Sequence, residues 1–92
     1  MYKFREFYIR DQMMDAIRNY IDKQIHPGSF LTGVICNDLK MAVMCADDEN
    51  IKNIPAFTSY FYNEAPSNCW GSMDIMNNWL KYGLKINHKE HK

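Results

Sequence analysis

Apolar residues recur at helical spacing in four stretches of the chain, and residues that start or stop helices bound each stretch. In residues 11–25 the stripe consists of Met13, Ile17, Tyr20, Ile21 and Ile25. Side chains three and four positions apart share one face of a helix, so this spacing predicts an amphipathic helix. Asp11 stands where an N-cap is expected, and the Pro-Gly pair at 27–28 ends the helix.

The second stretch, residues 30–46, predicts a long central helix. Its stripe consists of Leu31, Val34, Ile35, Leu39, Ala42 and Val43. Most of the other positions are also apolar or small, which indicates a helix buried on more than one side. Asp38 falls on the stripe itself. Burying an unpaired carboxylate costs several kcal/mol, so we expect Asp38 to be paired, capped or at an interface.

The third stretch, residues 51–62, predicts a helix that Asp47 or Asp48 caps. Pro55 lies inside it, and there are two interpretations: either the proline kinks the helix, or it occupies the first turn of a helix that begins near Ile54. The apolar stripe consists of Ile51, Ile54, Thr58, Phe61 and Tyr62.

The fourth stretch begins after Ser72, a predicted N-cap, and ends near Gly83. Its stripe consists of Ile75, Met76, Trp79, Leu80 and Leu84. Ahead of all four stretches, residues 1–9 alternate weakly between apolar and polar, as in a short strand or an extended arm. We therefore expect an all-α fold: a compact bundle or orthogonal array of about four helices with an extended N-terminal arm. Residues 1–84 form the single helical domain, and residues 85–92 form a disordered basic tail.

Composition adds an expectation about assembly. The chain has 92 residues, 47% of them hydrophobic, with seven Met, six Tyr, five Phe and two Trp. That is more than one small core hides completely, so we expect a homo-oligomer, most simply a dimer. In the alternative, the surplus Tyr and Met side chains are half-exposed on a monomer. The net charge of zero argues against a broad nucleic-acid-binding face, which needs clustered basic residues.

The cysteines and histidines suggest no metal or catalytic site. The three cysteines have no CxxC spacing, and Cys36/Cys45 and His88/His91 do not form a ligand set of zinc type. His26 is the only histidine outside the tail, and no nucleophile and acid accompany it in a recognisable pattern. We expect no enzyme activity, no cofactor, and a reduced cytoplasmic protein with no leader and no membrane span.

Polar residues at helix ends and on apolar faces are the candidates for binding a ligand or partner: Ser29, Thr32, Asn37, Asp38, Asn50, Tyr62, Asn63 and Trp70. Hydroxyl groups near a helix N-terminus can hold a phosphate, and amides can read a base edge. Tyr62 and Trp70 can stack on a base or anchor a protein partner. The alternative is that these residues only cap helices and connect loops, because buried polar groups need partners.

The runs PGSFLTGVICNDL, ADDEN, FYNEAP and WGS together resemble a family of small uncharacterised proteins of tailed phages. The resemblance implies a non-enzymatic phage accessory protein acting in the host cytoplasm. It suggests that the protein binds and inhibits a host protein, most simply a defence component, as anti-CRISPR and similar counter-defence proteins do. The alternative is an oligomeric sponge that sequesters a nucleotide-derived immune signal. Because none of the basic residues in the helical region forms a run, we rank the protein partner first.

Overall fold

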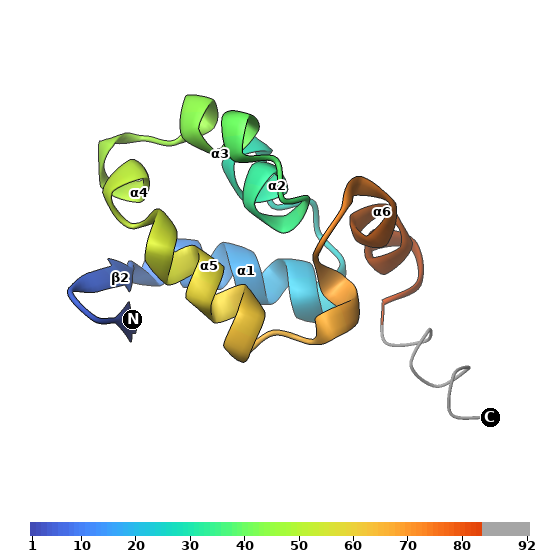
Figure 1. The fold of residues 1–92 in the computed structure, drawn as a ribbon. Coiled ribbons are helices and arrows are strands. Elements are labelled where there is room, and N and C mark those ends of the chain that lie inside the picture. Colours follow the sequence, from blue (N-terminus) through green and yellow to red (C-terminus); the bar gives the residue numbers. More distant parts are fainter. Residues whose placement is uncertain (84–92) are drawn as a thin grey trace.

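The computed structural model describes residues 1–83 and consists mostly of helices (Figure 1). The elements are β1 (Tyr2–Phe4), β2 (Phe7–Ile9), α1 (Asp11–Lys23), α2 (Ser29–Ile35), α3 (Leu39–Cys45), α4 (Asp48–Lys52), α5 (Ile54–Asn63), the 3₁₀ turn η1 (Ser67–Cys69) and α6 (Met73–Tyr82). The mainly helical prediction is confirmed, but six α-helices take the place of about four. The predicted basic tail, residues 85–92, lies outside the described residues.

The N-terminal arm is a β-hairpin, so the fold is not strictly all-α. Strands β1 and β2 pair antiparallel, with Tyr2 opposite Ile9 and Phe4 opposite Phe7. The Tyr2 hydroxyl lies 2.7 Å from the Ser59 hydroxyl of α5, and its ring meets Tyr60 edge-on at 5.2 Å between centroids. The alternating apolar residues therefore pack the hairpin on α5, which is why this segment is paired rather than simply extended.

The long central helix predicted for residues 30–46 is wrong, because the chain turns sharply between α2 and α3. Asn37 adopts a left-handed backbone (φ 59°), and the amide of Asp38 donates to the carbonyl of Gly33 at 2.8 Å. Asp38 then caps α3 by accepting a hydrogen bond from the amide of Met41 at 3.0 Å. Asp38 is thus an exposed N-cap and not a carboxylate on a buried stripe.

Gly33 permits the close packing of α2 against α3. A Cβ at this position would lie 2.4 Å from the backbone nitrogen of Ala42, closer than any side chain can approach. The two short helices therefore touch backbone to backbone, and α2 is buried along nearly its whole length while α3 is mostly exposed.

Most of the predicted helix ends match the structure, with three exceptions. The first helix was predicted to reach the Pro-Gly pair at 27–28, but α1 ends at Lys23, where Gln24 adopts a left-handed C-cap conformation (φ 55°). Asp47 caps α4, Ser72 caps α6, and Pro55 lies in the first turn of α5, as one of the two interpretations held. Asp11 is not the N-cap of α1: it is the first helical residue, and its carboxylate lies 2.6 Å from the N-terminal amine. Likewise Ser29 lies inside α2, and Gly28 occupies the N-cap position with a φ of 94°.

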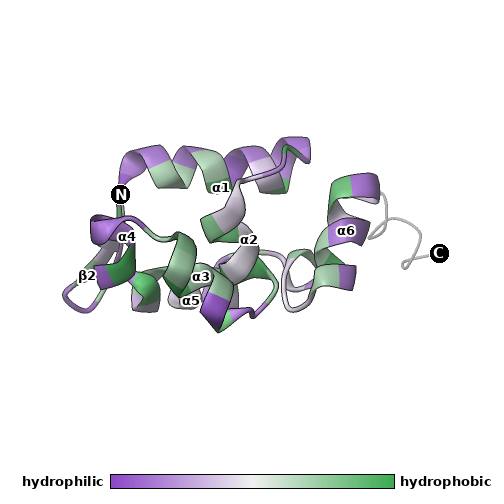
Figure 2. Ribbon diagram, turned by 90° about the horizontal axis from the view of Figure 1, so that it is seen from above, coloured by the Kyte–Doolittle hydropathy of each residue, from purple (hydrophilic) through white to green (hydrophobic). Residues whose placement is uncertain are grey.

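One hydrophobic core unites the described residues. In Figure 2, α1 and α5 lie on opposite sides with α2 between them, and α1 alternates between polar and apolar colouring. The centre contains the fully buried Ile17, Tyr20, Phe57, Phe61 and Trp79. Tyr20 donates its hydroxyl to the carbonyl of Cys69 at 2.6 Å, and Trp79 donates its indole N–H to the carbonyl of Tyr20 at 3.3 Å. Within residues 1–83, no buried side-chain polar atom lacks a hydrogen-bond partner.

Candidate functional site

An uncharged groove runs along the exposed side of α5. Its deeper end is a cavity of about 90 Å³ between α2, α3, α5 and Trp70, and its wider end is a shallow depression of about 410 Å³ that reaches the β-hairpin. Ile54 and Thr58, one helical turn apart, line both parts. The complete lining consists of Phe4, Gly33, Val34, Asn37, Leu39, Ala42, Ile54, Pro55, Thr58, Ser59, Tyr62, Asn63 and Trp70. We call this surface the α5 groove.

The sequence of α5 explains why one of its sides stays open. Ala56, Phe57 and Phe61 point into the core, and the ring of Phe57 meets Phe30 of α2 edge-on at 4.9 Å. Thr58 and Tyr62, one turn apart, lie on the exposed side. The short α3 turns back after Asn37 and forms one wall, so the groove exists because the predicted long helix is broken in two.

The deep end of the groove is rigidly built. The amide of Gly71 donates to the carbonyl of Ile35 at 2.7 Å, and the side-chain amide of Asn37 donates to the carbonyl of Gly71 at 3.4 Å. These bonds hold the chain directly after the half-buried Trp70, and the hydrogen bond from Tyr20 to the carbonyl of Cys69 holds it directly before. The ring of Trp70 lies 6.2 Å from that of Phe61. One part of the indole therefore belongs to the core and another lines the cavity.

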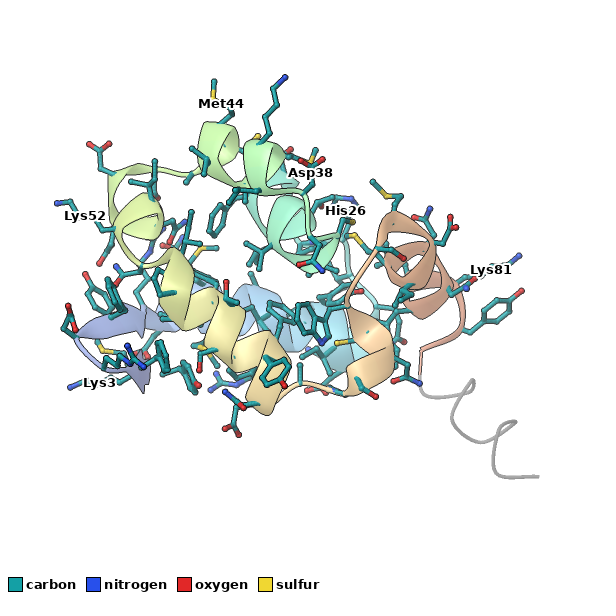
Figure 3. The ribbon with its side chains drawn as sticks, viewed as in Figure 1. Lys3, His26, Asp38, Met44, Lys52 and Lys81 are labelled. Carbon is teal, nitrogen blue, oxygen red and sulfur yellow. The ribbon has the colours of Figure 1, made fainter. Side chains whose placement is uncertain are left out.

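Large apolar side chains stand exposed on α3 and α5, and two of them, Leu39 and Tyr62, line the groove. The exposed fraction is 71% for Leu39 and 75% for Met44 on α3, and 76% for Tyr62 on α5. Figure 3 shows Met44 and Asp38 projecting outward from the α2–α3 pair. Burial of exposed apolar area is the main source of affinity in protein association, so this surface suits a protein partner.

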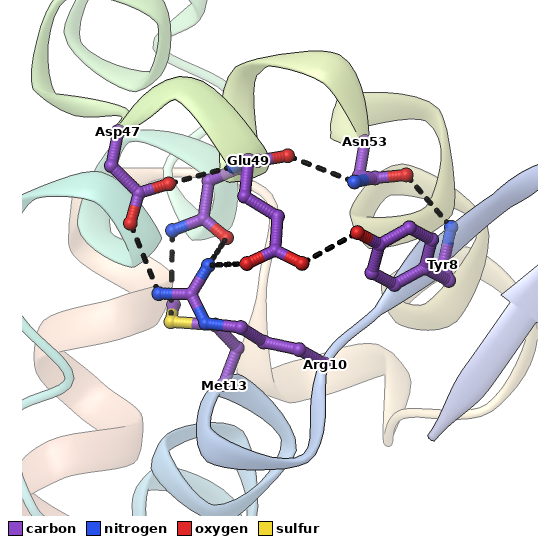
Figure 4. Close-up of polar contacts among 7 residues, drawn as sticks. Tyr8, Arg10, Met13, Asp47, Glu49 and Asn53 are labelled. Atoms are coloured by element: carbon purple, nitrogen blue, oxygen red, sulfur yellow. Dashed lines mark hydrogen bonds and ion pairs between the residues drawn. The ribbon is translucent and has the colours of Figure 1, made fainter.

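Apart from the groove, a cluster of polar and charged side chains, which the sequence interpretation missed, joins β2 and the start of α1 to α4 (Figure 4). The guanidinium of Arg10 donates to Asp47 at 3.0 Å, to Glu49 at 3.1 Å and to the side-chain oxygen of Asn50 at 3.0 Å. Tyr8 donates its hydroxyl to Glu49. We call Tyr8, Arg10, Asp47, Glu49, Asn50 and Asn53 the Arg10 clasp.

The contacts within the Arg10 clasp indicate a structural role. The side-chain oxygen of Asn53 accepts from the amide of Tyr8 at 2.9 Å, and its nitrogen donates to the carbonyl of Glu49 at 2.8 Å. The pKa of Asp47 is lowered, first by the backbone amide of Asn50 and then by Arg10. Each charged group is matched by an opposite charge or a donor, so the cluster holds two segments together and leaves little capacity for a substrate.

The structure brings four of the eight predicted binding residues into the α5 groove and leaves four elsewhere. Asn37 and Trp70 line the cavity, while Tyr62 and Asn63 line the wider depression. These four residues come from the α2–α3 turn, the end of α5 and the segment after η1. Only the folded chain places them on one surface.

The other four predicted residues do not converge. Thr32 is buried and donates its hydroxyl to the carbonyl of Gly28 at 2.7 Å. Asn50 belongs to the Arg10 clasp, Asp38 caps α3, and Ser29 is exposed in the first turn of α2. The hydroxyl of Thr32 bonds to the backbone, so of the two predicted hydroxyl groups near the start of α2 the one exposed to a ligand is that of Ser29.

The periodicity of apolar residues did not indicate the roles of Arg10 and Glu49 in the clasp or of Leu39 and Ile54 in the groove. Arg10 precedes a predicted helix, and Glu49 stands in an acidic run that helix capping already explains. The apolar Leu39 and Ile54 were assigned to buried stripes, although they line an open groove.

The cysteines and acids provide little reactive chemistry. Burial raises the pKa of the Cys69 thiol to about 12 and also raises that of Cys36, which opposes formation of a reactive thiolate. In the part of the chain that the structure describes, no three His, Cys, Asp or Glu residues gather closely enough to hold a metal ion. Residues 1–83 also contain no helix with the length and apolar character that a bilayer span requires.

Comparisons with models of protein families, with curated proteins and with solved structures give no match to this chain.

Proposed function

We propose that this protein is a non-enzymatic binding protein that docks on another protein through the α5 groove. In the phage setting that the sequence resemblance implies, the partner is a host protein, most simply a defence component, and docking inhibits it. One observation carries the proposal: an uncharged groove is lined by the large, highly exposed side chains Leu39 and Tyr62. An apolar segment of a partner gains free energy by covering such a surface.

The lining of the groove favours a protein over a nucleotide-derived signal. Of the thirteen residues that line its two parts, none is Lys, Arg or His, so a phosphate group there would lack a cation. The small cavity beside Trp70 has room for about one aliphatic side chain. A buried anchor of that kind, surrounded by weaker contacts, is typical of protein interfaces.

The same lining gives reason to propose binding rather than catalysis. Its polar groups are hydroxyls, amides and an indole N–H, without an acid–base pair among them. A hydrolytic or group-transfer site needs a nucleophile within hydrogen-bond reach of a base.

Thr58→Glu tests the proposal, because it places a charge at the middle of the groove on an exposed position. Gln12→Glu, on the exposed side of α1, adds the same charge elsewhere and serves as the matched control. We expect affinity-tagged wild type and Gln12→Glu to recover the same stoichiometric host protein, and Thr58→Glu to lose it while keeping its circular dichroism spectrum. Equal recovery by Thr58→Glu and wild type contradicts docking through this groove.

Native mass spectrometry of the purified protein separates the protein partner from the sponge alternative. After purification from infected cells, we expect a mass that protein chains alone account for, with no small molecule retained. A retained phosphorylated small molecule would instead support sequestration of a nucleotide signal.

A further inference from the structure

Three sulfur atoms meet where α2 ends against the beginning of α6. The thiol sulfur of Cys36 lies 3.5 Å from the thioether sulfur of Met76 and 3.9 Å from that of Met73. Met73 and Met76 are three residues apart on α6 and therefore lie on neighbouring turns of one side. Cys36 immediately follows α2, so two separate elements supply the cluster.

The cluster is anchored on the inside and open on the outside. Met76 is 1% exposed and belongs to the core, whereas Met73 is 48% exposed and Cys36 is half-buried. An ion from solvent can reach the three sulfurs past the flexible side chain of Met73, and the buried Met76 keeps the inner ligand in place.

We propose that Cys36, Met73 and Met76 form a binding site for one Cu(I) ion. A thiolate and two thioethers are soft ligands, a set that selects Cu(I), whereas carboxylate and water ligands select Mg²⁺ or Ca²⁺. Three sulfurs bound to one ion in a plane, each at about 2.3 Å, lie about 4.0 Å from one another. The observed separations of 3.5 and 3.9 Å need only a few tenths of an ångström of expansion.

Binding of Cu(I) to the three sulfurs changes no oxidation state. Cu(I) enters already reduced, the Cys36 thiol releases its proton to solvent, and one copper–thiolate and two copper–thioether bonds form. The ion links residues that are 37 and 40 positions apart in the sequence, so it ties α6 to α2. A ligand that binds only the folded state stabilises it by mass action, and we expect the melting temperature to rise with Cu(I). The sequence interpretation, which expected no metal site, did not consider methionine thioethers as ligands.

Anaerobic titration with Cu(I) in the presence of bicinchoninate, a coloured competitor, tests the site. We expect the protein to withdraw one equivalent of Cu(I). Cys36→Ser should abolish this transfer, and Met73→Leu should weaken it at least about tenfold with little change in packing volume. Failure of the wild-type protein to withdraw one equivalent overturns the proposal.

Two control variants separate the three-sulfur site from adventitious binding. Cys45→Ser removes an exposed thiol and Met44→Leu an exposed thioether, and both should leave the titration unchanged. X-ray absorption of the copper-loaded protein should show three sulfur neighbours. Binding that survives Met73→Leu together with Met76→Leu, or that is lost in Cys45→Ser, contradicts the assignment. Circular dichroism checks that each variant remains folded.

Discussion

At the scale of single residues, Asp38 has a different role in the structure from the one that its position on the apolar stripe suggested. Asp38 was expected to lie on the stripe of one long helix and to be paired, capped or at an interface. It is an exposed cap on α3, accepting one hydrogen bond from the amide of Met41. The cost of removing it is therefore that of a helix cap.

We predict that Asp38→Ala lowers the free energy of unfolding by about 1 kcal/mol, the typical loss when a capping side chain is removed. Asp38→Asn should restore most of this difference, because an asparagine oxygen also caps. Urea denaturation of wild type, Asp38→Ala and Asp38→Asn measures the free energy of unfolding. A loss above about 3 kcal/mol for Asp38→Ala would return the residue to a buried role.

Asp47 allows a prediction of pH dependence at the same scale. Its pKa lies below the ordinary value of 3.8 in the folded protein, first because it accepts from the Asn50 amide and then because of Arg10. A lowered pKa means that the charged carboxylate favours folding. This stabilisation is complete well above pH 3.8 and disappears as the pH falls through the lower folded value.

Comparison of wild type with Asp47→Asn tests this dependence, because asparagine keeps one oxygen that can accept from the Asn50 amide and removes the negative charge that faces Arg10. We predict that wild type has the higher melting temperature at pH 7 and that the difference shrinks as the pH falls below 3.8. Asp48→Asn, at the neighbouring exposed position, is the charge-matched control and should show a smaller difference at pH 7. A difference for Asp47→Asn that does not change with pH contradicts the proposed attraction to Arg10.

At the scale of elements, tight turns divide two predicted helices and thereby create surfaces. The break at Asn37 turns one long helix into the packed pair α2–α3, and the break at Asn53 separates α4 from α5. The first break opens a wall of the α5 groove. The second gives the Arg10 clasp its partner on α4, since Asn53 bonds both to β2 and to Glu49.

We predict that Gly33→Ala destabilises the α2–α3 pair more than an ordinary surface substitution. The added Cβ would meet the backbone of Ala42 at 2.4 Å, so the helices must separate. Overpacking of this kind typically costs about 1–3 kcal/mol, even though alanine favours helix. Thermal denaturation measures the effect, and hydrogen exchange should place the loss of protection in α2 and α3. An unchanged melting temperature would show that the pair can shift freely.

At the scale of the whole molecule, the surplus of aromatic and Met side chains is partly explained. Tyr20, Phe57, Phe61 and Trp79 fill one core, while Met44 and Tyr62 remain largely exposed. Both alternatives from the sequence stay open at this point: a dimer that covers the exposed residues, or a monomer that keeps them for a partner.

The dimer stays a prediction, and we assign it to the outer face of α3, where Val43 and Met44 are exposed outside the α5 groove. Sedimentation at micromolar concentration should show twice the chain mass of 10.9 kDa. Val43→Glu combined with Met44→Glu should give the monomer, whereas Thr58→Glu, in the α5 groove, should not. A wild-type monomer at these concentrations contradicts the prediction.

The sequence alone determined the local features of this protein. The helical stripes, the cap at Ser72 and a cap at Asp47 or Asp48 depend on interactions between residues a few positions apart, whereas the structure decided for Asp47 and for Pro55 in a first turn. Periodicity and capping chemistry report such interactions directly. For the same reason, the mainly helical class was correctly predicted.

Only the tertiary structure decided which surfaces exist. The turn at Asn37 depends on the contact of Gly33 with Ala42, the Arg10 clasp joins residues about 40 positions apart, and the α5 groove combines four separate segments. A hydrophobic stripe shows that a helix buries one side, but not which neighbour covers that side or where the cover ends. Those outcomes depend on competition among all the apolar surfaces of the chain for one small core.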